Sequence, residues 1–347
     1  MSRRLVFAYP GRLDLNTGGY AYDRRVIAGL EALDWEIELL ALGEGFPFPS
    51  ASVKAAATKA LSSLAEGTLV MIDGLALGVL DDWAEKAALR HTIVALVHHP
   101  LALEGGLSAE QAATFRQSES RALSFASAVV VTSPMTAREL SANYGVAADD
   151  ITTAVPGTDP APMRAAKSRT PHILSVGSLI GRKGHDVLIE SLDRVRDLAW
   201  TAVIIGSRDL DPAVTAALEA QIRQLGLGAR LRLAGECSDV RSVMASADIF
   251  ALASRYEGYG MVFAEALSHG LPIVACHAGA VPDVVPEDAG ILVDVDYVEA
   301  FADALRLLLT DMAERQRRAE ASRKAGAALP GWPVTARIIA TRLESLA

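Results

Sequence analysis

Short apolar runs rich in Val, Ile and Leu alternate along this chain with longer segments in which apolar residues recur at helical spacing. Such alternation is typical of βα units that build a parallel sheet. In the first half we expect strands at residues 5–9, 36–42, 69–73, 92–98, 128–132 and 151–155. In the second half we expect them at residues 172–178, 201–207, 230–235, 248–254, 272–276 and 290–294. Ser108, followed closely by the acceptors Glu110 and Gln111, is the predicted N-cap of the helix after the fourth strand. The pattern predicts an α/β protein made of two similar domains in tandem.

A proline-rich segment separates the two halves. Residues 155–171 read VPGTDPAPMRAAKSRTP and show neither helical nor strand periodicity, as expected of an interdomain linker. We therefore expect a first domain over residues 1–162 and a second over residues 170–330. A last amphipathic segment, residues 333–347, is predicted to be helical.

Composition and charge narrow the class of protein. With 51% hydrophobic and 22% charged residues, the chain is expected to be globular. Its formal charge is −9, and residues 1–162 carry 12 Lys and Arg against 19 Asp and Glu, a balance of −7. Nucleic acids and strongly anionic membrane surfaces attract basic patches, so we expect neither as a partner. The two cysteines, Cys237 and Cys276, are too few for a disulfide framework or a zinc site.

The longest apolar runs fall short of the roughly 18 residues that a membrane-spanning helix needs. The first residues, MSRRLVFAYPGRLD, are expected to lead into the first strand rather than to form a signal peptide. We therefore expect no transmembrane segment and a cytoplasmic location, with peripheral contact to the inner face of the membrane left open.

Residues that follow strands are the candidates for a functional site, because ligands of parallel α/β sheets bind beyond the carboxyl ends of the strands. Gly18 and Gly19 precede a helical run, where backbone N–H groups could approach a ligand; an ordinary glycine turn is the alternative. The fourth strand ends in His98 and His99, and a neutral imidazole there could exchange a hydrogen bond with a substrate hydroxyl. A structural histidine is equally compatible with that position. The G-x-G-x-x-G spacing of NAD-binding domains does not occur.

The second domain opens with HILSVGSLIGRKGHDVLIESL, in which Arg182 and Lys183 lie in a glycine-flanked loop between a strand and a helix. Two cations beside exposed N–H groups at the start of a helix suit a phosphate or a diphosphate. A solvated basic turn is the alternative. A Walker loop is excluded, because the G-x-x-x-x-G-K-[ST] spacing does not occur.

The segment SRYEGYGMVFAEAL, residues 254–267, carries two glutamates. We expect Glu257 in the loop after a strand and Glu265 about one and a half turns inside a helix that begins near Gly260, deeper than helix capping would use. Two carboxylates that flank a row of N–H donors suit a polyhydroxylated ligand with a phosphate. The loop HAGAVPDVV, residues 277–285, would border the same pocket. The alternative is one exposed and one salt-bridged glutamate.

Together these segments resemble the retaining GT-B glycosyltransferases of glycosyltransferase family four. SRYEGYGMVFAEALSHGLPIVAC is similar to the family's glutamate–seven residues–glutamate motif with the helix and strand that follow. VGSLIGRKGHDVLIESL resembles its diphosphate-binding segment, and VPGTDP resembles its interdomain segment. The resemblance covers nearly the whole chain and is strongest over residues 172–294. It implies two Rossmann-like domains facing a central cleft, with a final helix, after Trp332 and Pro333, that returns to the first domain.

The resemblance also implies roles for the matching residues. Glu265 would bind the ribose hydroxyls of the nucleotide, Glu257 the transferred sugar, and Lys183 would neutralise the diphosphate. One of the two histidines would orient the sugar or the acceptor, and we favour His98 over His99. The catalytic set is then Glu257, Lys183, Arg182 and His98, and the further donor-binding positions are Gly18, Gly19, Ser178, Tyr259, Gly260, Met261 and Val262.

The chain departs from the family pattern at two places. The family usually has an arginine where this chain has Ser178, and we expect Arg182 to supply the missing charge from a different backbone position. The asparagine of the interdomain segment is replaced, since the chain reads Pro156, Gly157, Thr158 there.

The function implied by the resemblance is transfer of a hexose from a nucleotide-diphosphate sugar to an acceptor hydroxyl, with retention, to give an α-glycoside. UDP is the expected nucleotide, and the acceptor is a small molecule, a lipid or a saccharide chosen by the loops 43–54 and 99–110. No cofactor and no metal are expected, because Asp294, Val295 and Asp296 look like a D-x-D motif but are predicted to form a turn before a helix. Two alternatives remain open: a UDP-sugar epimerase of the same architecture and a catalytically silent nucleotide-sugar-binding protein.

Overall fold

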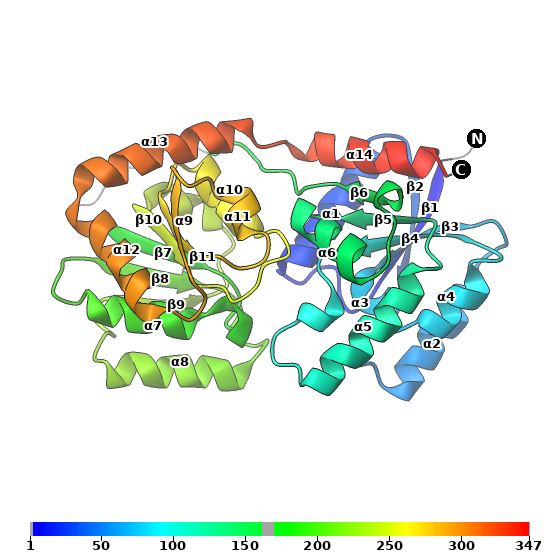
Figure 1. The fold of residues 1–347 in the computed structure, drawn as a ribbon, viewed down its shortest axis with the longest axis horizontal. Helices are drawn as coiled ribbons and strands as arrows, with labels where there is room; N and C mark the ends of the chain where they lie inside the picture. The colour runs from blue at the N-terminus through cyan, green and yellow to red at the C-terminus, as the bar shows by residue number, and fades with distance from the viewer. Residues whose placement is uncertain (1–2, 162–169, 347) are drawn as a thin grey trace. The chain divides into compact units, whose positions relative to one another are not determined.

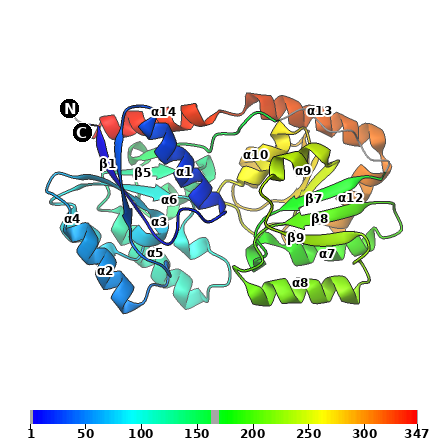
Figure 2. The same cartoon turned by 180° about the vertical axis from the view of Figure 1, so that it is seen from behind.

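The computed structural model describes residues 3–161 and 170–346, and the chain divides into two units (Figures 1 and 2). Unit 1 comprises Met1–Gly157 and Pro330–Ala347, and unit 2 comprises Thr158–Leu329. The sequence-based boundary at residue 162 and residues 162–169 of the expected linker lie outside the described residues. Each unit is described below by itself.

Unit 1 is built on a six-stranded parallel sheet with the strand order β2-β1-β3-β4-β5-β6. Its strands are β1 Arg4–Tyr9, β2 Glu36–Ala41, β3 Leu69–Asp73, β4 Thr92–Val97, β5 Ala128–Val131 and β6 Ile151–Thr153. Its helices are α1 Gly18–Glu31, α2 Ala51–Ser62, α3 Gly74–Leu77, α4 Asp81–Ala87, η1 Leu101–Leu103, α5 Ala109–Leu123, α6 Pro134–Asn143, η2 Ala148–Asp150 and α14 Trp332–Glu344.

Unit 2 repeats this architecture with a six-stranded parallel sheet in the order β12-β11-β10-β7-β8-β9. Its strands are β7 His172–Val176, β8 Thr201–Ile205, β9 Leu231–Gly235, β10 Ile249–Leu252, β11 Ile273–Cys276 and β12 Gly290–Val293. Its helices are η3 Gly181–Lys183, α7 His185–Arg194, α8 Pro212–Gln224, α9 Val240–Ser246, α10 Met261–Ser268, α11 Val281–Val284, α12 Val298–Thr310 and α13 Met312–Ala328.

Helices cover both faces of each sheet (Figure 1), so the central strands are apolar along their whole length. Every residue of β5, β10 and β11 is buried. The edge strand β2 is instead largely exposed. In the described part of the chain, the twelve strands coincide with the apolar runs of the sequence to within one or two residues at each end. The expectation of two Rossmann-like α/β domains is confirmed.

The N-cap that the sequence predicts for α5 is confirmed by the structure. Ser108 and Gln111 form a reciprocal capping box at the start of α5: the Gln111 N–H donates to Ser108 Oγ at 3.1 Å, and the Ser108 N–H donates to Gln111 Oε1 at 2.8 Å. The pair satisfies two N–H groups that the first turn of the helix would otherwise leave without partners.

The final helix, α14, packs on α1 of unit 1, as the sequence predicts (Figure 1). The two helices approach so closely at Gly29 that a Cβ added there would lie 2.5 Å from Ala336 Cβ. Trp332, the first residue of α14, stacks edge-on against Tyr22 of α1, and Thr335 Oγ1 donates a hydrogen bond of 2.8 Å to the carbonyl of Val155. Among the described residues, no helix combines the length and the apolar character that crossing a bilayer requires.

Candidate functional site

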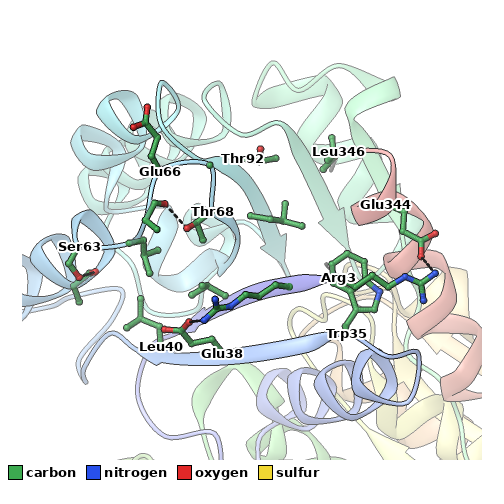
Figure 3. A pocket seen from close by; sticks show the side chains of 17 residues that line it. Arg3, Trp35, Glu38, Leu40, Ser63, Glu66, Thr68, Thr92, Glu344 and Leu346 are labelled. Carbon is green, nitrogen blue, oxygen red and sulfur yellow. Dashed lines mark hydrogen bonds and ion pairs between the residues drawn. The ribbon is translucent and has the colours of Figure 1, made fainter. Parts of the chain in front are cut away.

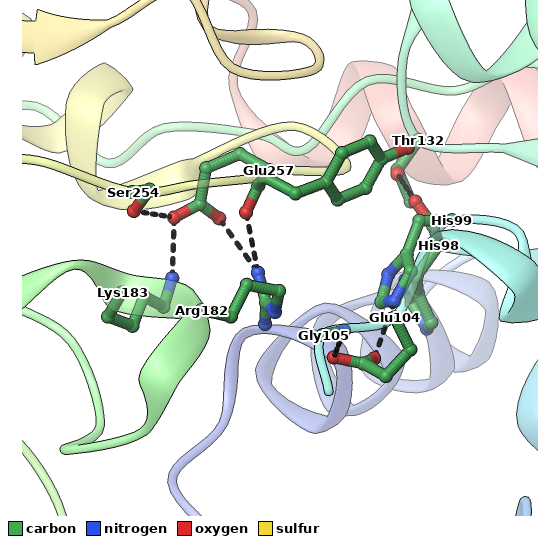
Figure 4. Close-up of polar contacts among 10 residues, drawn as sticks. His98, His99, Glu104, Gly105, Thr132, Arg182, Lys183, Ser254 and Glu257 are labelled. Atoms are coloured by element: carbon green, nitrogen blue, oxygen red, sulfur yellow. Dashed lines mark hydrogen bonds and ion pairs between the residues drawn. The ribbon is translucent and has the colours of Figure 1, made fainter. Parts of the chain in front are cut away.

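The carboxyl edge of the unit 2 sheet holds a buried charge cluster centred on Glu257 (Figure 4). Glu257 follows β10, and its side chain is 6% exposed. Its Oε1 accepts hydrogen bonds from Lys183 Nζ at 2.7 Å and from Ser254 Oγ at 2.6 Å. Arg182 Nη1 lies 3.6 Å from Glu257 Oε2 and donates to the carbonyl of Tyr256 at 2.8 Å. The structure thus brings together Glu257, Arg182 and Lys183, which the sequence singled out separately.

The cations keep Glu257 ionised. Burial alone would raise the pKa of this carboxyl, but the charges of Lys183 and Arg182, together with the hydrogen bonds from Lys183 and Ser254, hold its pKa below the usual value. Two cations and one carboxylate leave the cluster with a net positive charge. Such a cluster favours an anionic ligand.

The loop after β7 positions both cations because glycine lets it turn where no side chain would fit. Lys183 closes the short helix η3, and Gly184 then takes a left-handed conformation with φ +62° before α7 begins. A Cβ at Gly184 would collide with the carbonyl oxygen of Ala253, next to the Glu257 loop. The aliphatic part of Lys183 packs over Gly177, where an added Cβ would lie 3.2 Å from Lys183 Cδ. Ser178 is half-buried in the same loop and stays a predicted binding position.

Helix α10 begins at Met261, four residues after Glu257, and its N-cap residue, Gly260, makes no side-chain cap hydrogen bond. Gly260 is its N-cap, with φ +88°, and the helical residues Met261 and Val262 follow. Glu265, the fifth residue of α10, is half-buried. Tyr259 is buried, and burial raises its pKa to about 12, so its phenol is neutral at physiological pH. The sequence-based start of this helix near Gly260 is confirmed.

Arg255 ties three loops of this edge together. Its guanidinium donates to both carboxylate oxygens of Asp186, at 3.1 and 2.7 Å, and to Asp296 at 2.8 Å. It also donates to the carbonyl of Gly181. Asp294 and Asp296 lie between β12 and α12, and Asp296 has φ +61°, so the D-x-D segment is the turn that the sequence predicts.

The loop 277–285 packs against the backbone of Glu257. The Ala280 N–H donates to the Glu257 carbonyl at 2.9 Å, and Gly279, with φ +58°, leaves no room for a Cβ beside that carbonyl. The side chain of Glu257 is thus fixed by Lys183 and Ser254, and its backbone by the loop 277–285.

The carboxyl edge of the unit 1 sheet holds the two histidines, which take different partners (Figure 4). His98 Nε2 lies 3.0 Å from Asp23 Oδ1 and 3.6 Å from Asp73 Oδ2. His99 Nε2 lies 2.8 Å from Glu104 Oε2, within the loop that follows β4. Both histidines follow β4, which ends at Val97.

Gly18 and Gly19 were expected to precede this helix, but they are the first two residues of α1: Thr17 is the N-cap and accepts from the Tyr20 N–H. The backbone of Gly19 lies against the His98 ring: a Cβ there would be 3.5 Å from His98 Cδ2. Gly18 has open space around it.

The surroundings of His98 favour its protonated form. The sequence suggested that a neutral imidazole could serve at this position. Burial also opposes the charged form, but Asp23 and Asp73 raise the pKa of His98 to about 10.

Asp23, Asp73 and His98 also form a group of ligand atoms that all lie within 4.8 Å of one another, a spacing that could hold a cation. Each of the three residues offers one such atom. The expectation that the protein needs no metal stays a prediction.

The sequence analysis missed the residues that support the predicted ones: Asp23, Asp73, Ser254 and Arg255. Two of them, Asp73 and Asp23, could have been identified from their positions in the sequence. Asp73 ends the apolar run LVMID, at the sheet edge where ligands bind, and Asp23 stands on the otherwise apolar buried face of α1. A carboxylate on a buried helix face requires a partner.

A cavity of about 980 Å³ opens at the opposite edge of the unit 1 sheet (Figure 3). Arg4, Leu69 and Thr92 line it, and each begins a strand. None of the predicted site residues lines this cavity. Because sites in parallel sheets form at the carboxyl ends, we do not assign the predicted chemistry to it.

Residues 163–325 match the family described as glycosyl transferases group 1. Among curated proteins, the chain is similar to the D-inositol 3-phosphate glycosyltransferase of Xylanimonas cellulosilytica, with 31% identity over 235 residues, which are 62% of this chain and 56% of that protein. The chain thus spans about half the length of this curated relative.

Two solved structures share the fold over nearly the whole chain. Sucrose-phosphate synthase from Thermosynechococcus elongatus matches with a TM-score of 0.83 and 19% identity, covering 98% of both chains. HepE from Anabaena, in complex with UDP-glucose, matches with a TM-score of 0.77 and 18% identity, covering 98% of this chain and 99% of that one. At such identities the likeness establishes the fold, which is GT-B, as the sequence predicts.

Proposed function

We propose that this chain, whose residues 163–325 match the glycosyl transferases group 1, transfers a sugar from a nucleotide-diphosphate sugar to an acceptor hydroxyl. The observation that carries the proposal is the cluster of Lys183, Arg182 and Glu257 at the carboxyl edge of the unit 2 sheet. Its net positive charge suits a diphosphate, and the uncapped N-terminus of α10 supplies backbone N–H donors in the adjoining loop. Glu265, on the same helix, is the proposed ligand of the ribose hydroxyls.

We propose a UDP-hexose as the donor. Support comes from HepE, which shares the fold and was solved with UDP-glucose. The acceptor is a small molecule, a lipid or a saccharide, and the loops of unit 1 at residues 43–54 and 99–110 are proposed to select it.

The proposed chemistry relies on electrostatic stabilisation of the leaving group. Negative charge develops on the departing nucleoside diphosphate, and Lys183 and Arg182 lie in a buried setting where fixed cations act strongly. Side-chain cations then take the place of a metal ion, so we propose metal-independent transfer. We assign no covalent nucleophile and propose that the acceptor attacks from the face the leaving group departs from, which retains the configuration and gives an α-glycoside.

The geometry of Glu257 indicates which of its oxygens serves the substrate. Oε1 already accepts from Lys183 and Ser254. Oε2, 3.6 Å from Arg182, is therefore the oxygen that we assign to a sugar hydroxyl. The two hydrogen bonds to Oε1 would fix the carboxylate while Oε2 binds.

A donor screen tests this proposal. Nucleoside diphosphates and UDP-sugars are added singly, and the melting temperature is recorded, because a ligand of the folded state raises it by mass action. We expect UDP-sugars to raise the melting temperature of the wild type but not of Lys183→Ala, while the exposed-lysine control Lys324→Ala behaves like the wild type. No shift with any nucleoside diphosphate would contradict the proposal.

The same donors separate the alternatives. Incubation of the stabilising UDP-sugar without acceptor, followed by NMR, gives a new epimer if the protein is an epimerase and slow release of free sugar if it is a transferase. Neither product, together with tight donor binding and no transfer to any acceptor tested, would identify a silent binding protein.

A further inference from the structure

His98 is the exposed member of a buried polar cluster in unit 1. Asp23 comes from α1, Asp73 from the end of β3, and His98 from the residue that follows β4. The side chains of Asp23 and Asp73 are 0% and 2% exposed, whereas that of His98 is 18% exposed. A ligand at this edge of the sheet can therefore reach His98 but not the two carboxylates.

Both carboxylates face the same nitrogen of His98. Nε2 lies 3.0 Å from Asp23 Oδ1 and 3.6 Å from Asp73 Oδ2, so Nε2 must carry a proton in any favourable arrangement. The backbone of Gly19 lies beside the same edge of the ring, closest to Cδ2 and Nε2. Among the described residues, Nδ1 has no hydrogen-bond partner, so it is the nitrogen left for a ligand.

We propose that Asp23 and Asp73 are positioning residues that hold His98 as an imidazolium with Nε2–H fixed, so that Nδ1–H is a permanent donor to an oxygen of the bound sugar nucleotide. The proposal rests on the proposed function for the identity of the ligand. The assignment of His98 Nδ1 as the donor, and of a positive charge to His98, depends only on contacts within unit 1.

Because Asp23 and Asp73 are buried, their negative charges need a nearby positive charge, and His98 is placed to provide it. Asp23 Oδ2 has no hydrogen-bond partner among the described residues, so His98 is the group that compensates the Asp23 charge. Asp73 uses Oδ1 to accept from the Leu75 N–H at 2.7 Å, which starts α3, and turns Oδ2 toward His98. Burial raises the pKa of Asp23 to about 6, and the two carboxylates raise that of His98 to about 10.

The other titratable groups near the cluster do not replace His98 as the cation. Tyr22 presents its ring edge-on to His98 and donates its hydroxyl to the Ala154 carbonyl at 2.8 Å. Tyr20 likewise donates to the Pro10 carbonyl. Arg24 has the smallest of the effects that shift the pKa of Asp23, and its guanidinium donates to the carbonyls of Leu13 and Leu15.

The direct test is a pH titration of the full chain labelled with ¹⁵N at histidine, with the His98 signals assigned by comparison with His98→Gln. We expect both ring nitrogens of His98 to stay protonated from pH 6 to pH 9 in the wild type. In Asp23→Asn the His98 pKa should fall toward its usual value near 6.5. Asp73→Asn should lower it less, and keeps an acceptor oxygen for the Leu75 N–H. Asp149→Asn, which removes an exposed carboxylate from the same unit, is the control and should leave the titration unchanged.

Two results would overturn the proposal. One is a His98 that is neutral at pH 7.5 in the wild type, a measurement that needs no variant to fold. The other is one equivalent of a tightly bound divalent metal in the purified protein, since a metal on Nε2 excludes its proton.

The pH dependence of kcat/KM is a second test, because a residue that only stabilised the fold would not change it. We expect kcat/KM for sugar transfer to be flat between pH 6 and pH 8.5 in the wild type. In Asp23→Asn it should fall roughly 75-fold over this range, as a histidine of pKa near 6.5 loses its proton. A pH profile of Asp23→Asn parallel to that of the wild type would count against the role of Asp23. If the wild type transfers no sugar from any donor, the proposed function fails, and the NMR titration still decides the charge of His98.

Discussion

Lys183 Nζ lies 2.7 Å from Glu257 Oε1, so the two residues most central to the proposed chemistry form one buried ion pair. Removing one partner of a buried pair costs about 3 kcal/mol of folding free energy, because the other charge is left uncompensated. We expect Lys183→Ala and Glu257→Gln each to reduce sugar transfer by at least about 100-fold, a size typical of lost transition-state electrostatics.

Denaturant unfolding separates these effects. The double variant Lys183→Ala/Glu257→Gln should be more stable than the sum of the single changes predicts, with a coupling of about 1–3 kcal/mol. The exposed-lysine variant Lys324→Ala should match the wild type in both assays. Additive losses of stability would show that the pair is not coupled.

Gly260 starts α10 with φ +88°, a conformation that L-residues rarely adopt, and an added Cβ would lie 2.7 Å from Phe263 Cδ2. We expect Gly260→Ala to lower the free energy of unfolding by about 1–3 kcal/mol. Gly228→Ala, at a glycine of the same unit with open space around it and no positive φ, should stay within about 0.5 kcal/mol of the wild type. Chemical denaturation of the three proteins measures both, and equal losses in the two variants would refute the argument from backbone strain.

Glu119 anchors the loop after β4, since its Oε2 accepts the Leu101 N–H at 2.8 Å, and burial raises its pKa to about 8. Its ordinary pKa is 4.5, so between pH 4.5 and pH 8 the folded state binds a proton that the unfolded state has lost. The contribution of Glu119 to stability therefore falls as pH rises through this window, by up to about 1.4 kcal/mol per pH unit, and is constant above pH 8.

Glu119→Gln lacks this ionisation, so its stability relative to the wild type should rise from pH 5 to pH 8. Urea unfolding at several pH values measures the trend, with the exposed Glu66→Gln as the control. A difference between Glu119→Gln and the wild type that does not change with pH would contradict the prediction.

Gly29 lies under α14, with room for no side chain between it and Ala336. We expect Gly29→Val to lower the stability of unit 1 by about 1–3 kcal/mol through overpacking. Ala28→Val places the same side chain one position earlier on the exposed side of α1 and should cost less than 1 kcal/mol. Thermal unfolding followed by circular dichroism compares the two, and an equal loss in both would show that helix propensity, rather than contact with α14, is responsible.

The strands were predictable from the sequence because both faces of each central strand are buried. Runs such as AVVV at β5 and IVAC at β11 need no knowledge of their neighbours to be recognised. The starts of two helices were predictable for a similar reason. Gly184 and Gly260 each stand directly before a helix with a positive φ, a conformation that glycine adopts easily.

The pairing of charges was not predictable in the same way. Lys183 and Glu257 are 74 residues apart in the chain, and His98 and Asp23 are 75 apart. Their contacts follow from the order in which the strands lie in each sheet, which the apolar pattern does not encode. For this reason the sequence alone did not point to a charged His98, whereas the positions of Asp23 and Asp73 favour its protonated form.

Unit 2 is one uninterrupted stretch, Thr158–Leu329, whereas unit 1 needs α14 to cover α1. On the ribosome, the half that is made first is thus the half completed last. Until Trp332 and the residues after it emerge, the side of α1 around Tyr22 and Gly29 stays uncovered, while unit 2 already has its full sequence. The nascent chain must therefore carry an incomplete unit 1 until all of unit 2 has been made.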